Sequence, residues 1–439
     1  MPPLGQCPVD YARTTRDLGA ALSIIRTMPA NSWQRVNQNA FASVQAPVSL
    51  QPSCTSIGGP NAIVNAWGGF AYDSNRGDLL TFGGGHADYC GNDVYRFRLA
   101  TLSWERAGLS SQMKVWQLDS TTQTGIPVDG LENAPMTSHM YDHLNFMPSA
   151  DRMIYFGGRP FWGGSNAPTY DGLQHPHTGP WLFDPTKADG NKVVGTTGSA
   201  ADPAIIGGRM WENREYASNH PGSYLPASYG ITASSATVCS AGRDVVFMRA
   251  ATAGSLGSVL IKYEVPSLAT RGQDSMVQLS SNTNHMGQAD MAVDPERAIA
   301  VLIGDSNSRP LAFWDLNAAG SRNPLQTITG LTSDGSFSYS NKYGMDFDVS
   351  RGRFLIWNGE STVWELRPPN ETRVSQSGWQ VTRLIASGGP AGELLPSGGG
   401  ANGKWKYAPD LDVFIGLREA PGGDVWIYKP DGWRDPASR

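Results

Sequence analysis

The sequence predicts an all-β fold, a β-propeller of six four-stranded blades, or of seven if one blade is hidden in a long insertion. Three observations lead to this prediction. A unit of strand, turn, strand, loop and strand recurs along the 439 residues. A lone strand pattern lies before the first complete unit, and the last unit lacks its fourth strand. The 51 glycines, 30 prolines, 14 tryptophans, 15 tyrosines and 14 phenylalanines suit short strands joined by tight turns.

The repeated unit is clearest in Leu79–Trp104, which reads LLTFGGGHADYCGNDVYRFRLATLSW. The apolar run Leu79–Phe82 ends in three glycines, and the polar loop His86–Asp93 follows. Val94–Phe97 then alternates apolar and polar residues, as a half-buried strand does. Because one such sheet cannot bury both of its faces, the copies are expected to pack side by side.

Six copies of the unit can be read. Copy by copy, the expected strands are Gly69–Asp73, Leu79–Phe82 and Val94–Phe97; Tyr141–Pro148, Arg152–Gly158 and Trp181–Asp184; Tyr229–Ala233, Asp244–Met248 and Leu260–Val265; Ala289–Asp294, Ala298–Ile303 and Leu311–Leu316; Met345–Asp348, Arg353–Trp357 and Thr362–Leu366; Trp405–Pro409, Asp412–Ile415 and Val425–Tyr428. The same turn occurs at Asp73–Gly77, Asp294–Arg297 and Asp348–Gly352, because Asp and Gly supply the bends it needs.

The lone strand pattern at Asn31–Val36 is expected to close the ring as the outer strand of the last blade. Closure removes the exposed sheet edges that invite aggregation. The predicted division is an N-terminal extension at 1–31 and the propeller at 32–439. A single helix at about 15–28 is expected in the extension, beginning at the capping-box-like pair Thr14 and Asp17. This helix either packs against the propeller or docks it to a larger protein assembly.

Charge and hydropathy exclude two classes of partner. The net charge of −5 gives no reason to expect nucleic acid, and no apolar run approaches the roughly 20 residues of a membrane helix. The N-terminal sequence has no signal-peptide pattern, so the location is open, and an extracellular or virion-associated site follows only if the target is a glycan. The four cysteines, Cys7, Cys54, Cys90 and Cys239, allow three pairings, and we favour free, buried thiols.

The histidines predict where a functional site would lie. In a propeller, the loop between strands two and three and the link to the next blade lie on one face. Five histidines fall in these segments, namely His86, His175, His177, His220 and His285. His139 and His143 enter the first strand of the second copy, so all seven lie on or just inside one face. If 139–143 is a strand, then His139, Tyr141 and His143 share one side of it near the central channel.

These residue types favour the chemistry of an anionic sugar. Few carboxylates accompany the histidines, which argues against a two-carboxylate glycosidase, and no G-x-S-x-G elbow is present. Arginine would hold a uronate carboxylate, an aromatic ring would stack on the sugar, and Tyr and His could exchange the proton of a β-elimination. The substrate-binding candidates are Arg209, Arg214, Trp162, Trp211, Tyr141 and His143. A purely structural role remains open for each of them.

The Phe-Gly-Gly-Gly turn at 82–85 and the later Trp104 resemble kelch and galactose-oxidase propellers. The GGGH loop, with further His, Tyr and Arg on the same face, resembles propeller-type polysaccharide lyases, including ulvan lyases. This resemblance implies four catalytic residues, His86, His139, Tyr229 and Arg249, with Arg209 or Arg214 as substitutes for Arg249. It implies no required cofactor and allows a structural zinc or calcium ion.

Two functional hypotheses follow. The first is a glycan-directed propeller, a lyase or depolymerase that cleaves an acidic polysaccharide. The second is a non-catalytic virion component, such as a phage tail or surface protein, or a cell-surface component that binds a host glycan or has a structural role. A copper-dependent oxidase is disfavoured, because the adjacent Tyr89 and Cys90 are its only sequence hint.

Overall fold

A computed structural model describes most of the chain. The described residues are 3–52, 59–65, 67–84, 89–117, 123–130, 133–137, 139–156, 169–170, 173–174, 179–195, 202–215, 234–251, 258–281, 288–304, 311–318, 320–340, 342–370, 374–390 and 400–439. Structural statements below concern these residues.

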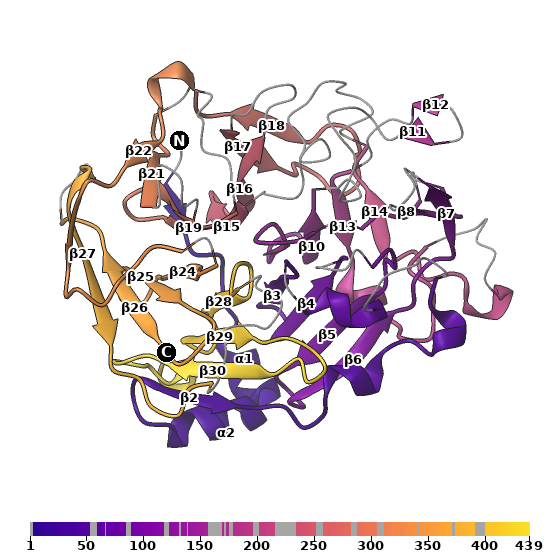
Figure 1. Ribbon diagram of the computed structural model, residues 1–439, viewed down its shortest axis with the longest axis horizontal. Coiled ribbons are helices and arrows are strands. Elements are labelled where there is room, and N and C mark those ends of the chain that lie inside the picture. Colours follow the sequence, from indigo (N-terminus) through magenta and orange to yellow (C-terminus); the bar gives the residue numbers. More distant parts are fainter. Residues whose placement is uncertain are drawn as a thin grey trace.

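Six sheets, antiparallel except for one added outer strand in the fifth, form a ring around a central channel, so the predicted six-bladed propeller is confirmed (Figure 1). From the channel outwards, the first three blades are β3 (Phe70–Asp73), β4 (Asp78–Phe82), β5 (Val94–Arg98) and β6 (Ser103–Gly108); β9 (Asn145–Met147), β10 (Arg152–Tyr155), β13 (Trp181–Phe183) and β14 (Trp211–Asn213); β15 (Ser234–Ser240), β16 (Arg243–Ala251), β17 (Ser258–Glu264) and β18 (Ser275–Gln278).

The other three blades continue around the ring. They are β19 (Ala289–Asp294), β20 (Ile299–Gly304), β21 (Leu311–Asp315) and β22 (Gln326–Thr327); β24 (Gly344–Asp348), β25 (Arg353–Trp357), β26 (Val363–Arg367) and β27 (Ser377–Leu384), with β23 (Gly330–Ser333) outside β27; β28 (Trp405–Ala408), β29 (Val413–Leu417), β30 (Val425–Lys429) and β2 (Ser32–Arg35). The long insertions contribute two small hairpins, β7 (Met113–Gln117) with β8 (Gln123–Pro127) and β11 (Thr169–Tyr170) with β12 (Leu173–Gln174), and no seventh blade among the described residues.

The ring closes through the N-terminal strand, as predicted. Strand β2 pairs antiparallel with β30 and places Trp33 opposite Tyr428. The indole of Trp33 also packs against Trp357 and Trp405, with ring centroids 5.6 and 5.4 Å apart. The closing strand is therefore held by backbone pairing on one side and by aromatic packing against the fifth and sixth blades.

The predicted aspartate turns are also confirmed. Asp73 and Asp294 each accept backbone N–H groups from the residues two and three positions on. All six turns between first and second strands end in a residue of positive φ. In chain order these residues are Gly77, Asp151, Gly242, Ala298, Gly352 and Asp412, with φ of 71°, 55°, 75°, 51°, 61° and 58°. The repeat thus extends to one backbone conformation that glycine occupies in only three of the six copies.

The N-terminal extension differs from the single helix expected at 15–28. It forms α1 (Tyr11–Asp17) and α2 (Gly19–Thr27), and the N-cap of α1 is Asp10, whose side chain accepts the N–H of Arg13. Capping by Asp10 starts the first helix earlier than the predicted pair at Thr14 and Asp17. No described helix is long and apolar enough to span a membrane.

The apolar side of the two helices is covered by the propeller. Leu18, Leu22 and Ile25 are fully buried in a cluster with strands of the first and sixth blades. The packing role that the sequence left open is therefore observed, and this apolar side is not available for docking to another protein. The boundary between 31 and 32 stays a prediction.

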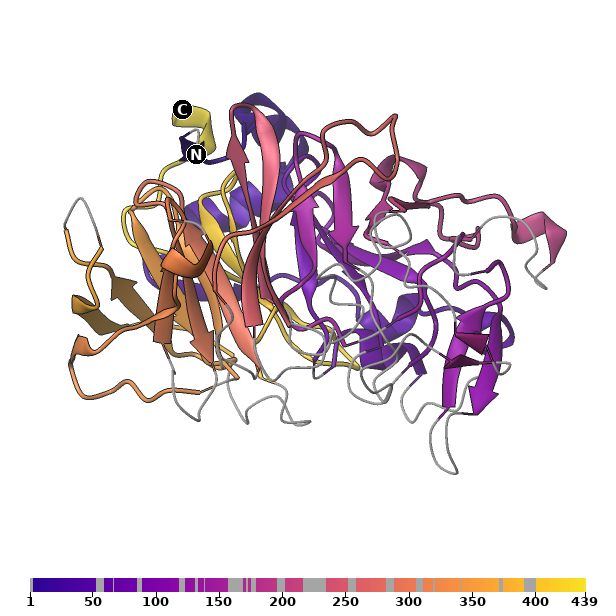
Figure 2. The same ribbon diagram turned by 90° about the horizontal axis from the view of Figure 1, so that it is seen from above.

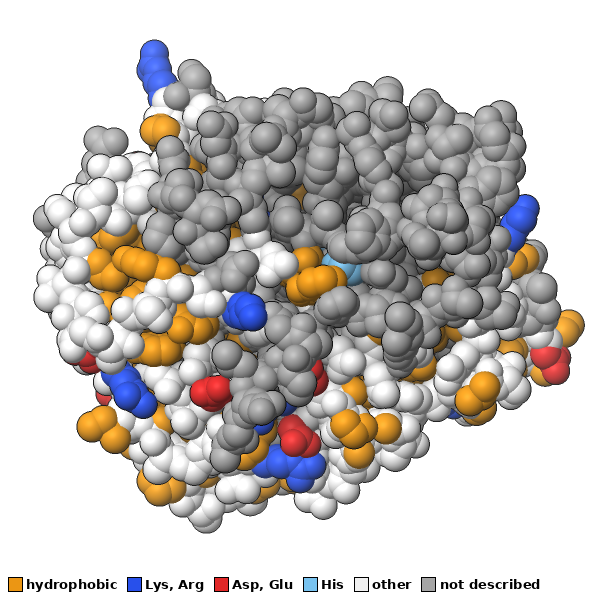
Figure 3. Space-filling model, viewed as in Figure 1, with side chains coloured by type: hydrophobic (Ala, Val, Ile, Leu, Met, Phe, Trp, Pro, Cys, Tyr) orange, Lys and Arg blue, Asp and Glu red, His pale blue; other side chains and the backbone are white. Residues whose placement is uncertain are grey.

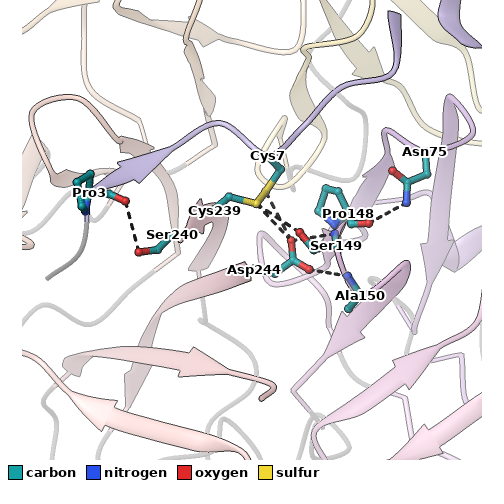
Figure 4. Close-up of a disulfide and its surroundings, with 9 residues drawn as sticks. All are labelled: Pro3, Cys7, Asn75, Pro148, Ser149, Ala150, Cys239, Ser240 and Asp244. Carbon is teal, nitrogen blue, oxygen red and sulfur yellow. Dashed lines mark hydrogen bonds between the residues drawn. A yellow bond between two sulfur atoms is a disulfide. The ribbon is translucent and has the colours of Figure 1, made fainter. Parts of the chain in front are cut away.

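The expectation of free thiols is wrong. Cys7 and Cys239 form a disulfide, and Cys90 is disulfide-bonded as well. The bridge holds the N-terminal segment, where β1 (Leu4–Gly5) pairs with β15, against the inner strand of the third blade (Figure 4). A sequence separation of 232 residues gives no local signal of this pairing.

The two ends of the channel lie on different faces. The turns between first and second strands form one, which we call the turn face, and α1, α2 and the marked chain ends lie on that side (Figure 2). The links between blades and the loops between second and third strands form the other, which we call the mouth face. Figure 1 looks along the channel.

Candidate functional site

Two of the seven histidines are described. His139 and His143 lie in the link between the first and second blades, on the mouth face. The candidates His86, His175, His177, His220, His285, Tyr229 and Trp162 lie outside the described residues. The gathering of all imidazoles on one face therefore stays a prediction.

The expected alternation of His139, Tyr141 and His143 along a strand is wrong. Strand β9 begins only at Asn145, and Tyr141 has a φ of 42°, so the chain turns at that residue. The ring of His139 lies 5.9 Å from that of Tyr141. His143 instead stacks on Tyr155 at 5.5 Å and is fully buried.

A second aromatic residue completes the group at the channel mouth. The half-buried Trp67 lies 4.4 Å from His139 and 6.1 Å from Tyr141, measured between ring centroids. Its carbonyl accepts the N–H groups of Met140 and Tyr141 at 2.9 and 2.8 Å. We call Trp67, His139 and Tyr141 the mouth cluster. Figure 3 views this face, where hydrophobic side chains and a histidine are visible near the middle.

The mouth cluster holds unusual backbone strain. Trp67 has a φ of 62° and Tyr141 a φ of 42°. A left-handed conformation costs a bulky residue about 1–2 kcal/mol, because its Cβ crowds the following carbonyl. Strain of this kind persists only where the surroundings enforce it, and it gathers at functional sites.

Two glycines make room for the backbone carbonyl of Tyr141. A Cβ on Gly69 would lie 2.2 Å from the Tyr141 carbonyl oxygen, and a Cβ on Gly403 would lie 1.7 Å from it. At its other end, the Tyr141 hydroxyl is 3.1 Å from the Nε2 of Gln288, which donates to it. Sequence reasoning missed Trp67 and both glycines, because their importance appears only where distant segments meet.

The link that carries Trp67 is tied to the sixth blade by a buried lysine. The Nζ of Lys404 donates to the carbonyls of Val64 and Asn65 at 2.9 and 2.7 Å. Burial lowers the pKa of Lys404 to about 8. The contact fixes the approach of the chain to Trp67, so Lys404 positions the mouth cluster.

A buried cluster of charges lies beside the mouth cluster. Lys406 of β28 donates to Asp142 at 2.5 Å, and Asp142 also accepts the N–H of Met291 in β19. Asp290 accepts the N–H of Gly403 at 3.0 Å, next to Tyr141. Burial and then the charge of Asp142 raise the pKa of Asp290. Although burial opposes it, the three neighbouring carboxylates raise the pKa of Lys406, which stays protonated.

The channel contains a cavity of about 160 Å³ on the turn side of these charges. Lys406 and Asp346 line it together with Tyr72 and Met291, and residues 5–7 of the N-terminal segment line it as well. Burial raises the pKa of Asp346 to about 6. The disulfide of Cys7 therefore anchors a segment that borders the cavity.

Arg249 is the catalytic candidate of the third blade, and the structure brings it towards this region. Arg249 lies in β16 opposite Ser234 and is 1% exposed. Ser234 in turn forms a β-bridge with Asp142. Ser234 therefore separates Arg249 from the segment that carries His139 and Tyr141.

Three other arginine and tryptophan candidates lie elsewhere. Arg214 is fully buried, and its guanidinium binds Asp274, Glu212 and the carbonyls of the β17–β18 connection, so it ties two blades together. Trp211 packs in the core between the first and second blades. Arg209 is exposed in the connection between β13 and β14. We do not include these three residues in the mouth cluster.

The described residues contain one group with the composition of a metal site, Cys7, Cys239 and Asp244. Because the two sulfurs form a disulfide, they cannot act as thiolate ligands, and this group does not fit a zinc ion. We assign no metal to it.

No protein-family model matches the chain, and neither does any curated protein. Solved structures are similar to the chain. One of them is a Penicillium chrysogenum alpha-L-arabinanase complexed with arabinobiose, 10% identical, with 88% of this chain and 97% of that chain covered and a TM-score of 0.37. A likeness this low carries no argument about activity, and the propeller fold rests on the sheet topology described above.

Proposed function

We propose that the protein binds an acidic, uronate-containing polysaccharide at the mouth cluster and cleaves it by β-elimination. The observation that carries the proposal is the strained pair Trp67 and Tyr141 around His139. An aromatic ring offers an apolar face to a sugar, and imidazole and phenol groups exchange protons near neutral pH when their surroundings assist.

The reaction needs a base, an acid and a cation. The base removes the proton from the carbon beside the carboxylate, the carbon–oxygen bond of the glycosidic link breaks, and a carbon–carbon double bond forms. The departing sugar oxygen receives a proton from the acid. His139 and Tyr141, with ring centroids 5.9 Å apart, supply this base and acid, and Arg249 supplies the cation that binds the carboxylate. His86 and Tyr229 are the further catalytic candidates.

Carboxylate chemistry is less well supported. A glycosidase needs two carboxyl groups on either side of an accessible sugar bond. Asp290 is fully buried, and Asp142 is 1% exposed and already bound to Lys406 and a backbone N–H. These carboxylates hold blades together across the channel instead of facing a substrate.

The alternative is a non-catalytic component of a virion or cell surface that binds a glycan. One observation favours it: His139 is 1% and Tyr141 4% exposed, which leaves little ring surface for proton transfer. The disulfide of Cys7 and Cys239 suits an oxidising location outside the cell under either proposal.

The test measures cleavage and binding separately. Polygalacturonate, alginate, hyaluronate and ulvan are incubated with the protein, and the ultraviolet absorbance of the unsaturated product is followed. We expect a rise with wild type that His139→Ala and Tyr141→Phe reduce at least tenfold, while Arg271→Ala, at an exposed site, leaves it unchanged. Binding in polysaccharide gels without any rise supports the non-catalytic alternative. If the protein neither binds nor cleaves any of these polysaccharides, both proposals are wrong.

A further inference from the structure

Four aromatic side chains gather on the mouth face of the fifth blade. Phe337, Tyr339 and Tyr343 come from the link between the fourth and fifth blades, and Trp364 comes from β26. The ring centroids of Phe337 lie 5.2 Å from Tyr339 and 5.5 Å from Trp364, and Tyr343 stacks on Trp364 at 5.3 Å. We call these four residues the aromatic platform. Figure 3 shows hydrophobic side chains gathered over this blade.

The platform presents apolar surface to solvent. Tyr339 is 42% exposed, one of few large apolar side chains exposed to that degree in the described residues, and Phe337 and Tyr343 are half-buried. Trp364 is 5% exposed and forms the base on which the other rings rest. Rings that are stacked below and open above suit the flat apolar face of a sugar ring.

Hydrogen bonds hold the platform in place before any ligand arrives. Asp334 accepts the N–H and the hydroxyl of Ser336, and its other oxygen accepts the N–H of Arg383 in β27. Ser336 in turn accepts the indole N–H of Trp364 at 3.2 Å. These bonds also lower the pKa of Asp334 to about 2. A binding surface that is already ordered loses little conformational entropy when a ligand binds.

The platform is connected to the mouth cluster by a short run of contacts. The carbonyl of Lys342 accepts the N–H of Ala401 at 2.6 Å. Two residues further along the chain, Gly403 packs against the carbonyl of Tyr141. Aromatic platform and mouth cluster therefore lie on one face and are linked through a single segment of the sixth blade.

A cation stands beside the platform. Lys342 is half-buried, adjacent to Tyr343, and forms no ion pair within the described part of the chain. An ammonium group without a carboxylate partner among the described residues is suited to bind the carboxylate of an acidic sugar.

We propose that the aromatic platform is a second binding subsite, which holds a sugar unit of an acidic polysaccharide whose chain extends from the mouth cluster. This inference rests on the proposed glycan-binding function. It predicts that the protein prefers long chains to short ones, because only a chain that lies on both sites gains the contacts of the platform. Tyr339 and Lys342 are the residues that contact the distant sugar and its carboxylate.

The test compares ligand lengths. Binding of a uronate disaccharide and of the long polymer is measured by calorimetry for wild type, Tyr339→Ala, Tyr339→Phe and Lys342→Ala. Tyr339→Ala is expected to weaken binding of the polymer at least about tenfold and to leave binding of the disaccharide unchanged. Removal of one aromatic ring that a ligand covers costs about that much affinity. Tyr339→Phe keeps the ring and should bind as wild type does. Tyr11→Ala, on the turn face, is the matched control and should change the binding of neither ligand.

Each outcome decides between the two proposals. If wild type binds both ligands and Tyr339→Ala binds the polymer unchanged, the second subsite is wrong and the proposed function stands. If Tyr339→Ala weakens both ligands equally, the platform acts through the fold and the subsite is again wrong. If wild type binds neither ligand, the proposed function fails and the subsite fails with it.

Discussion

Arg351 of the fifth blade donates two hydrogen bonds to Asp412 of the sixth blade, from Nη1 to Oδ1 at 3.1 Å and from Nη2 to Oδ2 at 2.9 Å. Arg351 also binds Asp348 in its own turn. The first and second blades repeat this arrangement, with Arg76 between Asp73 and Asp151. The turn that the sequence repeats therefore also fastens one blade to the next.

Replacing this arginine should destabilise the ring. Arg351→Ala is expected to lower the free energy of unfolding by about 1–3 kcal/mol, because the buried Asp348 and Asp412 would lose the cation that they share and keep only their ion pairs to Arg353 and Arg439. Urea denaturation measures the change. Arg271→Ala removes an exposed ion pair to Glu215 and should cost less than about 1 kcal/mol. Equal costs for the two variants would show that Arg351 does not fasten the blades.

Ala298 occupies the left-handed position of the fourth blade with a φ of 51°. Ala298→Gly should stabilise the protein by about 0.5–1 kcal/mol, because glycine adopts this conformation without strain. Ala292→Gly, in the buried strand β19, is the control and should destabilise it. A lower melting temperature for Ala298→Gly would contradict the prediction.

Stability should fall as the pH rises from about 4 to about 7. Burial raises the pKa of Asp346 to about 6, and burial raises the pKa of Asp78 to about 7, from 3.8 in each case. Between the ordinary pKa of 3.8 and the raised pKa of each carboxyl group, the folded state binds more protons than the unfolded chain. The stabilisation is therefore lost as the pH rises through the pKa of the folded state. Melting temperatures at pH 5 and pH 8 check this.

The variant Asp78→Asn tests the assignment of this pH effect. Its melting temperature should depend less on pH than that of wild type, because the amide does not titrate. A pH profile as steep as that of wild type would rule out Asp78 as a contributor.

The disulfide of Cys7 and Cys239 should contribute to stability. The double substitution Cys7→Ser and Cys239→Ser is expected to lower the free energy of unfolding by about 2–4 kcal/mol, since the bridge restricts the unfolded chain. Limited proteolysis should then cut the N-terminal segment faster. Unchanged proteolysis would mean that β1 and α1 hold the segment without the bridge.

Gly403 should be essential to the mouth cluster. Gly403→Ala would place a Cβ against the Tyr141 carbonyl, so we expect at least a tenfold loss of polysaccharide binding. Gly320→Ala is the control, because its φ of 67° matches the 68° of Gly403 and nothing lies near its Cβ. If both variants keep wild-type binding, the close packing around Tyr141 does not shape the site.

Much of the fold could be predicted because its signals are local. Ala289–Asp294 and Arg353–Trp357 are strands with the predicted bounds, since each is an apolar segment that ends at a turn. The role of Trp33 followed from a missing strand at the other end of the chain. Such features need only a pattern and a count of strands.

The site could be predicted only in part, because its geometry depends on distant residues. The Tyr141 carbonyl can lie where it does only because Gly69 and Gly403 carry no Cβ that would clash with it. From the sequence alone, Arg214 is expected to be a surface charge, whereas in the structure it is buried beside Asp274 of the next blade. Neither relationship leaves a trace in the residues around Tyr141 or Arg214.

The pairing of β2 with β30 has a consequence for biosynthesis. A ribosome makes β2 long before β30, so the closing strand waits unpaired until β30 has emerged. Until then the sixth blade does not exist and the first has no neighbour on one side. Nascent chains of this protein should therefore need protection from aggregation during translation, and stalled ones should not accumulate in a native form.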